Sequence, residues 1–208
     1  MTYGPSYQKF IEYVDQRKAR LAAESAARFE GHSRCVLEIG CGDGDFLVAY
    51  GQENPQQYCL GLDVYKLRVD KGLKKRDQLG LENVDFIRAE ATEWIETLPE
   101  HMAFDAVFLL FPDPWPKGKH FKKRLIQPDF LSLLAKKMAP EACLYFRTDH
   151  KGYFAWTQEH LAQHPDWTLG PVEWPLEVET RFQRIMGAYQ SLVAQCTPAA
   201  VPQALVHP

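Results

Sequence analysis

The stretch VLEIGCGDG, residues 36–44, decides the fold of this chain. It begins within a short apolar run, residues 35–39, that is too brief for a helix, and it ends in glycines at alternate positions. Such a run predicts a buried strand. Glycines between a strand and a helix permit a tight turn and let a ligand approach the backbone closely. Because residues 43–53 have a helical pattern, the stretch predicts a strand, a glycine loop and a helix in succession.

Strand and helix patterns alternate along the rest of the chain. This alternation predicts an α/β fold with a doubly wound, mostly parallel, Rossmann-like sheet of seven strands and helices on both faces. Trp174, Val178, Phe182 and Ile185 are expected to supply the last strands, at one edge of the sheet. The other strands are expected at 58–62, 84–88, 104–111 and 142–147, and the other helices at 7–29, 66–79, around Trp94, Ile95 and Leu98, at 128–138 and at 153–164.

A chain of 208 residues is expected to form one domain with short extensions. We assign residues 1–32 to a helical extension, 33–196 to the main domain and 197–208, which are rich in Ala and Pro, to a disordered tail. No apolar run approaches the ~18 residues of a membrane span, and the N-terminus lacks a signal pattern. We therefore expect a cytoplasmic protein with no membrane partner.

The cysteines and the net charge bear on the kind of site. The five cysteines are scattered and form no CxxC pair, which favours buried, reduced thiols, so neither disulfides nor a metal site is expected. The net charge of −3 shows that the whole molecule is not a basic nucleic-acid binder. Basic residues gathered on one face would still bind phosphates, because such contacts depend on local charge.

An acidic residue follows the glycine loop at the distance expected for a nucleoside site. Asp63 comes about twenty residues after the loop, at the end of the second expected strand, where a carboxylate can accept both ribose hydroxyls. With Gly40 and Gly42 as cofactor-binding residues, it predicts an adenosine-containing cofactor. Glu90, just past the third expected strand, lies where such folds contact an adenine, and a helix-cap or solvated role is nearly as good an interpretation.

Three acidic residues favour S-adenosylmethionine over a nicotinamide dinucleotide. Glu38 stands inside the first expected strand, where a buried charge is costly unless it has a partner such as the amino group of a methionine moiety. Asp43 and Asp45 would repel a pyrophosphate but tolerate a cationic sulfonium. Asp45 also takes the position of the third glycine in the dinucleotide fingerprint. The expected cofactor is therefore S-adenosylmethionine.

The segment PDPWPK, residues 112–117, follows the fourth expected strand, at the switch point where doubly wound sheets bind ligands. Its prolines fix the backbone around Asp113, which is expected to face the cofactor, and Trp115 offers a flat surface on which a base can stack. Five cations lie within the eight residues 117–124 and favour a polyanionic substrate, namely Lys117, Lys119, Lys122, Lys123 and Arg124. A second basic cluster, at 66–76, is interpreted as a solvated helix face because acidic residues interleave with it.

These motifs resemble those of the tRNA (guanine-N7)-methyltransferase family in its bacterial single-chain form. The resemblance runs from Cys35 to Gly187 and rests on PDPWPK with His120 and the basic run, on LEIGCG at 37–42, on Thr148-Asp149 and on TRFQR at 180–184. It implies the class I S-adenosylmethionine-dependent methyltransferase fold and methyl transfer to N7 of a guanosine in the variable loop of tRNA. The partner is then tRNA, with no obligatory protein partner, and a monomer or homodimer is expected.

The resemblance also implies roles for individual residues. The residues that match Glu38, Asp63, Glu90 and Asp113 contact the cofactor in that family, and the one that matches Asp113 is catalytic. The matches to Lys117, Asp149, Thr180, Arg181, Phe182 and Gln183 bind the substrate. The chain departs from the family pattern at Gln183, where an acid is usual, at Glu90, where Asp is common, and at Gly118, which replaces a residue that is often basic.

Other functions stay open on the sequence. A small-molecule methyltransferase would not need the basic run, and a non-catalytic RNA-binding module would not need the glycine loop with Asp63 and Asp113. A nicotinamide oxidoreductase is disfavoured by Asp43 and Asp45. The second hypothesis is therefore a methyltransferase that acts on another RNA or on a small heterocyclic acceptor.

Overall fold

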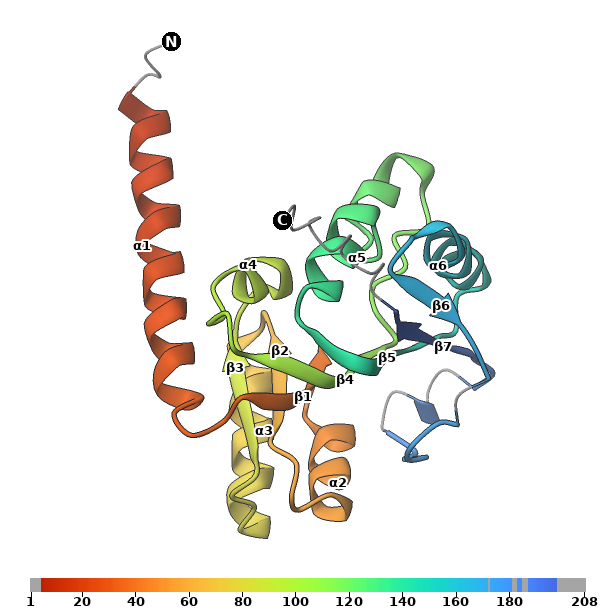
Figure 1. The fold of residues 1–208 in the computed structure, drawn as a ribbon, viewed down its shortest axis with the longest axis horizontal. Coiled ribbons are helices and arrows are strands. Elements are labelled where there is room, and N and C mark those ends of the chain that lie inside the picture. Colours follow the sequence, from red (N-terminus) through yellow and green to blue (C-terminus); the bar gives the residue numbers. More distant parts are fainter. Residues whose placement is uncertain (1–4, 172, 181–182, 185–186, 198–208) are drawn as a thin grey trace, which may run out of the picture.

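A computed structural model describes residues 5–171, 173–180, 183–184 and 187–197 of the chain. The strands of its single sheet span Arg34–Ile39 (β1), Cys59–Asp63 (β2), Val84–Arg88 (β3), Ala103–Leu110 (β4), Met138–Thr148 (β5), Trp167–Leu169 (β6) and Gln190–Cys196 (β7). Their order is β3-β2-β1-β4-β5-β7-β6 (Figure 1). β1 to β5 pair in parallel, and β7 pairs antiparallel with β5 and β6. The predicted doubly wound, mostly parallel sheet is confirmed, with its switch point between β1 and β4.

Helices cover both faces of this sheet. They span Pro5–Arg28 (α1), Asp45–Glu53 (α2), Lys66–Leu79 (α3), Ala91–Glu96 (α4), Pro128–Ala135 (α5) and Lys151–Gln163 (α6), with a 3-10 helix at Gly118–Lys123 (η1). α2 and α3 lie on one face and α4, α5 and α6 on the other (Figure 1). Successive strand residues face opposite sides, so Leu37 joins the core under α4 and α5 and Val36 the core over α2. The same alternation turns Glu38 toward α2.

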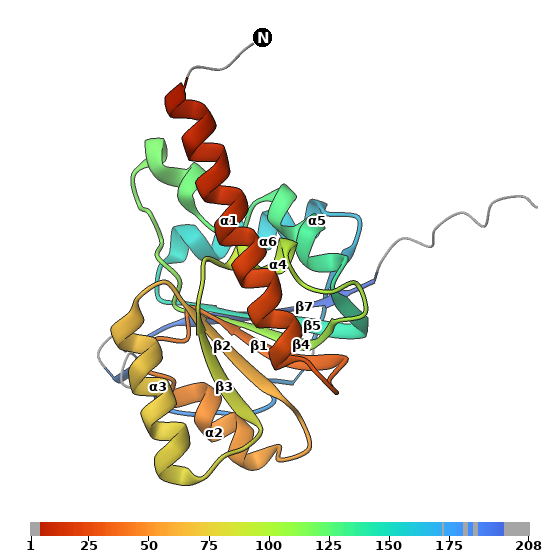
Figure 2. The same ribbon diagram turned by 90° about the vertical axis from the view of Figure 1, so that its left-hand side faces the viewer.

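The N-terminal helix α1 is held by its second half, and its first turns project from the domain (Figure 2). Trp94 Nε1 of α4 donates a hydrogen bond to Ser25 Oγ of α1 at 2.9 Å, and Arg17 pairs with Glu93. The helices that the structure describes include none that is long and apolar enough to cross a membrane. All five cysteines are buried and free, which confirms the prediction of reduced thiols.

The last strands are not formed by the residues predicted for them. Trp174 and Val178 lie in an extended segment at 173–180, which we call the strap, and the described part of the strap contains no strand. Inward and outward side chains alternate along it, so that Trp174, Leu176 and Val178 pack on the core that α2 also covers. The alternation correctly indicated one buried face, but the strap lies across the sheet instead of extending it. β6 and β7 form the edge (Figure 1).

Two further expectations concern boundaries. The helix expected at 128–138 ends at Ala135, because Met138 already belongs to β5. Phe182 and Ile185, like the tail at 198–208, lie outside the described residues.

Candidate active site

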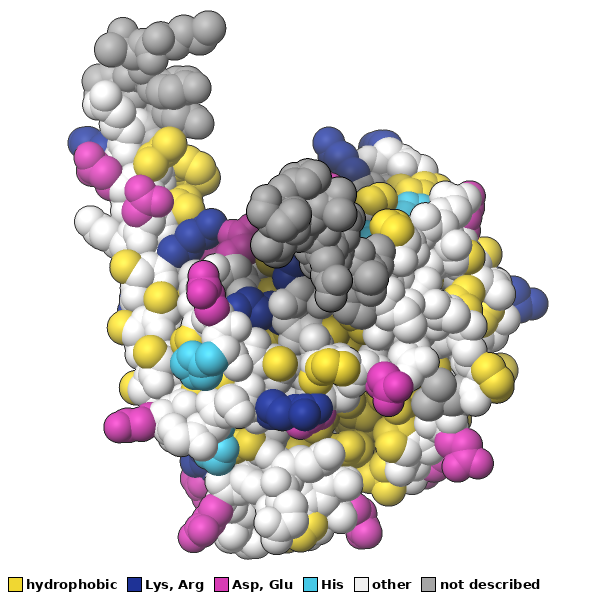
Figure 3. Space-filling view, viewed as in Figure 1, with side chains coloured by type: hydrophobic (Ala, Val, Ile, Leu, Met, Phe, Trp, Pro, Cys, Tyr) yellow, Lys and Arg dark blue, Asp and Glu magenta, His cyan; other side chains and the backbone are white. Residues whose placement is uncertain are grey.

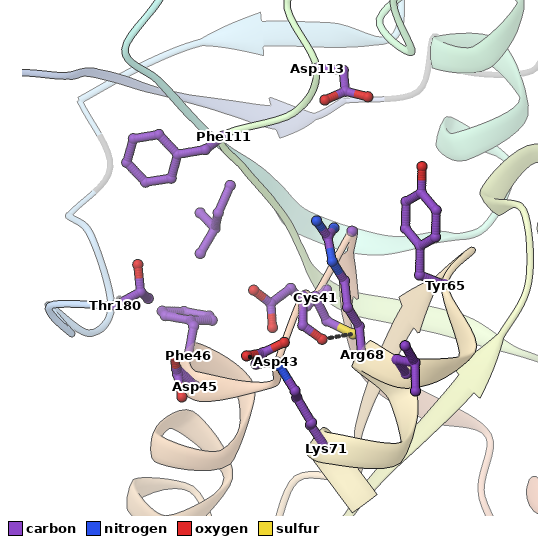
Figure 4. Close-up of a pocket in the computed structure, with 15 residues that line it drawn as sticks. Cys41, Asp43, Asp45, Phe46, Tyr65, Arg68, Lys71, Phe111, Asp113 and Thr180 are labelled. Atoms are coloured by element: carbon purple, nitrogen blue, oxygen red, sulfur yellow. Dashed lines mark hydrogen bonds and ion pairs between the residues drawn. The ribbon is translucent and has the colours of Figure 1, made fainter. Parts of the chain in front are cut away.

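A pocket of about 650 Å³ opens at the carboxyl ends of β1 and β4 (Figure 4). This is the switch point of the sheet, where doubly wound folds bind their ligands. The pocket collects residues from the glycine loop, the start of α3, the end of β4 and the strap. Its lining comprises Glu38, Gly40, Cys41, Gly42, Asp43, Asp45, Phe46, Tyr65, Leu67, Arg68, Lys71, Leu110, Phe111, Asp113 and Thr180.

The glycine loop presents bare backbone to the pocket. Gly40 and Gly42 have φ angles of 71° and 55°, and a Cβ built on either would meet nothing within 4 Å. A side chain there would project into the space that a ligand needs, in a backbone conformation that other residues rarely adopt. Gly44 has a different role, because its Cβ would lie 2.7 Å from the Phe86 ring. A glycine therefore does permit close helix packing, one residue before the fingerprint position at which the sequence shows Asp45.

The acidic loop is neutralised in the fold. Asp43 pairs with Lys71 at 3.0 Å, and Asp45 pairs with Lys75. Both lysines belong to α3, on the basic cluster that the sequence assigned to a solvated face. The expectation that Asp43 and Asp45 repel a pyrophosphate is thus weakened, since each carboxylate has a cation beside it.

Glu38 is the most unusual residue of the pocket. Its side chain is only 3% exposed, and its Oε2 atom has no hydrogen-bond partner among the described residues. Burial raises the pKa of this carboxyl well above its usual range, and the nearby Asp45 carboxylate raises it further. A buried acceptor without a partner is costly, and a hydrogen-bond donor from a ligand in the pocket would remove that cost.

Asp63 is buried behind the loop. Its Oδ2 accepts a hydrogen bond from Gly42 N at 3.1 Å, and its Oδ1 accepts one from Tyr65 N at 2.8 Å. Arg68 Nη1 lies 3.4 Å from Oδ2 and extends into the pocket below Asp113 (Figure 4). Asp63 therefore fixes the glycine loop while Arg68 balances its charge. Each carboxylate oxygen has two acceptor sites, so the two backbone bonds leave capacity for ribose hydroxyls.

Arg68 and Lys71 were missed as pocket residues. The sequence contained a usable signal, because a helix that follows a parallel strand starts at the carboxyl edge, so its first turn must lie beside the site. Glu90 lies outside the pocket lining. It caps α4, with Oε2 accepting a hydrogen bond from Glu93 N at 2.8 Å, which is the alternative interpretation left open for it.

Asp113 lies between two residues in a strained backbone conformation. Phe111 and Trp115 have φ angles of 51° and 43°, in the left-handed region that non-glycine residues rarely occupy. Asp113 itself is exposed, lines the pocket, and has no hydrogen bond or ion pair to another described residue. Lys123 Nζ lies 4.4 Å from the centroid of the Trp115 ring, so one face of this predicted stacking surface is already covered.

Arg124 was predicted to bind phosphate and does not have the exposure to do so. It is 3% exposed, and its guanidinium lies 3.9 Å from the centre of the Phe121 ring, with Trp156 also in contact. Its Nε donates to Pro114 O at 2.8 Å. Desolvation lowers the pKa of Arg124, the opposite of what a phosphate partner would cause. Arg124 therefore anchors the backbone next to Asp113.

The four lysines of the basic run are exposed, so their ammonium groups can reach phosphates. Lys117 precedes η1 and Lys119, Lys122 and Lys123 lie within it. None of the four forms an ion pair with a carboxylate that the structure describes. Dark blue Lys and Arg side chains are visible at the top of the right-hand lobe, where this segment lies (Figure 3). Lys117 and Asp149 are exposed at the same end of the sheet, after β4 and β5 respectively, but neither lines the pocket.

Thr180 and Gln183 form a reciprocal cap. Thr180 N donates to Gln183 Oε1 at 2.8 Å, and Gln183 N donates to Thr180 Oγ1 at 3.2 Å. Gln183 is 8% exposed, so its side chain holds the segment and Thr180 reaches the pocket. Glutamine serves this cap as well as an acid does, which accounts for the departure from the family pattern. Arg181 and Phe182 lie outside the described residues.

Comparisons with known proteins agree with this architecture. A family model described as "Putative methyltransferase" matches residues 32–196. The tRNA (guanine-N(7)-)-methyltransferase of Rhodospirillum rubrum is 34% identical over 157 residues, 71% of this chain and 60% of that protein. The enzyme of the same name from Halorhodospira halophila is 35% identical over 155 residues, 72% of this chain and 67% of that protein. The chain spans about 60% of the length of the first such relatives.

Solved structures resemble the fold at low sequence identity. The 16S rRNA methyltransferase KamB superimposes with a TM-score of 0.58 at 20% identity, covering 79% of this chain and 88% of that one. The 16S rRNA (adenine(1408)-N(1))-methyltransferase of Catenulisporales acidiphilia, solved with S-adenosylmethionine, gives 0.57 at 19% identity, with 90% and 93% coverage. At these identities the likeness establishes the Rossmann-like methyltransferase fold and no more.

Proposed function

Because this chain belongs to the tRNA (guanine-N7)-methyltransferase family, we propose that it transfers a methyl group from S-adenosylmethionine to N7 of a guanosine in tRNA. One observation carries the proposal beyond the family. The buried Glu38 carboxyl, whose Oε2 atom has no hydrogen-bond partner among the described residues, and the bare backbone of the glycine loop open into the same pocket that Asp113 lines. The pocket thus offers a cation-binding end and, across it, a free carboxylate.

The residues present fit S-adenosylmethionine. Glu38 Oε2 lacks a donor, and an ammonium group supplies one together with a positive charge. Gly40 and Gly42 leave room for a ligand against the backbone, and Asp63 retains acceptor capacity for hydroxyls. Glu90, as a helix cap, is at most a peripheral contact. When bound, the cofactor would supply an electrophilic methyl group.

Asp113 is the proposed catalytic residue, and its role is to orient the guanine and to stabilise the positive charge that develops on it. Guanine N7 carries a lone pair and no proton, so no side chain has to remove a proton before attack. The methylated ring gains positive charge, which a fixed carboxylate stabilises, and a carboxylate also accepts hydrogen bonds from the amino edge of guanine. Arg124 holds Pro114 O, and the strained residues on both sides restrict the backbone, so Asp113 is presented in a defined direction.

The substrate-binding set follows from the exposed groups around the pocket. We propose that Thr180 contacts the guanosine and that Gln183 acts by holding Thr180. Lys117 and Asp149 would act at the outer rim, beyond the pocket lining. Arg181 and Phe182 stay predictions. A tRNA substrate would agree with a location in the cytoplasm. That the protein is a monomer or homodimer without an obligatory protein partner stays a prediction.

Methyl transfer to unmodified tRNA transcripts tests the proposal directly. Labelled S-adenosylmethionine should transfer its label to tRNA, and aniline should then cleave the chain at 7-methylguanine, at one guanosine in the variable loop. Incorporation without aniline cleavage would reject N7 as the target atom. Cofactor binding without incorporation would favour the second hypothesis, a methyltransferase for another RNA or a small heterocyclic acceptor.

The exposed lysines should set the salt dependence of tRNA binding. We expect Lys119→Gln with Lys122→Gln to raise the KM for tRNA and to reduce the slope of log K against log salt by about 1.4 to 1.8, as for two lost phosphate contacts. Lys136→Gln, at the opposite end of the sheet just before β5, removes an exposed lysine as a control and should leave the slope unchanged. An unaltered slope in the double variant would mean that η1 does not touch RNA.

A further inference from the structure

Arg147 is a buried cation at the end of β5 that neither the pocket lining nor the basic run includes. It is 3% exposed. Its Nη1 and Nη2 atoms donate to the two carboxylate oxygens of Glu177 at 3.0 and 2.8 Å, and its Nε donates to Ser191 Oγ at 2.9 Å. The guanidinium also lies 4.0 Å from the centre of the Trp174 ring and 4.5 Å from that of Tyr189. Each of the three guanidinium nitrogens therefore donates a hydrogen bond.

Two of these partners belong to the strap. Trp174 and Glu177 flank its middle, and Thr180 at its end lines the pocket. Trp174 also packs edge-on against Tyr145 of β5, at 5.4 Å between ring centres. The strap contains no strand, so Arg147 supplies the polar attachment that a ladder of backbone hydrogen bonds would give elsewhere.

The backbone of Arg147 holds the opposite wall of the pocket. Its carbonyl oxygen accepts a hydrogen bond from Phe111 N at 2.7 Å, immediately before the segment that carries Asp113. The Phe111 ring packs edge-on against Tyr189, at 5.8 Å, and Tyr189 stacks on the Arg147 guanidinium. One residue thus joins the Asp113 side of the pocket, through its backbone, to the Thr180 side, through its side chain.

We propose that Arg147 and Glu177 form a clamp that positions the strap, and Thr180 with it, against the Asp113 segment for substrate binding. Both are positioning residues, since neither lines the pocket. The proposal rests on the proposed function for the identity of the substrate, and on contacts within the chain for the clamp itself. A guanidinium is required because one planar group makes the two-pronged bond to Glu177 while it also lies against two aromatic rings.

The clamp and simple electrostatics predict opposite changes in RNA binding when Glu177 loses its charge. Glu177 is 62% exposed, and Glu179, two residues further along the strap, is 73% exposed, with its partner Arg184 at 3.9 Å. Removing either negative charge near an RNA site should tighten RNA binding if charge alone matters. If Glu177 holds the strap, Glu177→Gln should instead weaken binding, while Glu179→Gln should not.

The experiment compares these two variants by steady-state kinetics with tRNA. We expect Glu177→Gln to raise the KM for tRNA about fivefold, with kcat and the Kd for S-adenosylhomocysteine within about twofold of wild type. Glu179→Gln should leave the KM equal or lower. Arg147→Lys keeps the charge but loses the planar fork, and it should raise the KM for tRNA as much as Glu177→Gln does. Combining the two substitutions should raise the KM no further. The clamp would be overturned if Glu177→Gln left the KM for tRNA equal to or below that of the wild type, as is expected for Glu179→Gln.

A second readout does not depend on activity. In protein labelled with 5-fluorotryptophan, the ¹⁹F resonance of Trp174, assigned through Trp174→Phe, should shift or broaden in Glu177→Gln and stay in place in Glu179→Gln. An unperturbed Trp174 signal in Glu177→Gln would reject the clamp even if the wild-type protein methylates tRNA. If the wild-type protein does not methylate tRNA, the proposed function fails, and the ¹⁹F result alone decides the clamp.

Discussion

Glu38→Gln is expected to stabilise the ligand-free protein and to abolish most of its affinity for S-adenosylmethionine. The two effects have one cause, the burial of an ionisable carboxyl whose Oε2 atom has no partner among the described residues. Glutamine removes the ionisable group, so folding no longer has to bury it, and we expect about 1 kcal/mol of added stability, or about 2–4 °C in Tm. The same change removes the counter-charge for the cofactor's ammonium group, which we expect to weaken binding about 100-fold.

The pH dependence of both effects follows from the direction of the pKa shift. Because burial raises the pKa of Glu38 in the folded protein, the folded state binds this proton more tightly than the unfolded state does. The contribution of Glu38 to stability is therefore full below its ordinary pKa and is lost as the pH rises through the raised value. The stability advantage of Glu38→Gln should grow over the same range. Thermal unfolding of both proteins at a series of pH values measures it.

Cofactor binding should also be coupled to the Glu38 proton, but it should lower the pKa that folding raises. An ammonium group beside Glu38 favours the carboxylate, so binding lowers the pKa of Glu38 and releases its proton. Affinity for S-adenosylmethionine should thus rise with pH until the raised pKa is passed. Calorimetry in buffers of different ionisation enthalpy should detect proton release in the wild type and none from this group in Glu38→Gln. Equal cofactor affinity in the two proteins would remove Glu38 from the binding site.

The parts of this site that the sequence predicted are those that depend on strand ends. In a parallel sheet, the residue at the end of each strand arrives at the same edge whatever the helices between them do. The order of the strands was therefore enough to predict that Glu38 and Asp113 lie at the same edge of the sheet. Gly40 and Gly42 were predicted from the turn that must follow the first strand. None of these inferences required knowledge of a long-range side-chain contact.

The parts that the sequence did not predict depend on partners distant in the chain. Arg124 looks like its neighbouring lysines in the sequence. Besides the nearby Phe121, its aromatic partners are Tyr153 and Trp156, about thirty residues later, and the sequence does not show that they lie beside it. The repulsion expected from Asp43 is weakened because Lys71 lies on α3, beside the loop. The strap was mistaken for strands because alternating burial reports one covered face and does not report whether the backbone pairs.

Asp113→Asn should separate the charge of the proposed catalytic residue from its shape. Asparagine is nearly isosteric and retains a hydrogen-bond acceptor, but it cannot stabilise the positive charge that methylation places on the guanine ring. We expect kcat to fall about 100- to 1,000-fold in Asp113→Asn and at least as far in Asp113→Ala. The Kd for S-adenosylhomocysteine should change by no more than about threefold, because Asp113 is exposed across the pocket from Glu38.

Single-turnover methylation with saturating tRNA provides the measurement for Asp113, since it reports the chemical step apart from product release. Asp149→Asn is the comparison, because it removes the same charge from an exposed aspartate at the same end of the sheet but outside the pocket lining. Its proposed role is substrate binding at the outer rim, so at saturating tRNA it should leave the chemical step nearly unchanged. If charge near the RNA were all that mattered, both variants would change turnover alike. A selective loss in Asp113→Asn assigns the electrostatic role to the carboxylate beside the strained Phe111 and Trp115 backbone. Wild-type turnover in Asp113→Asn would refute that role and leave Asp113 with hydrogen bonding alone.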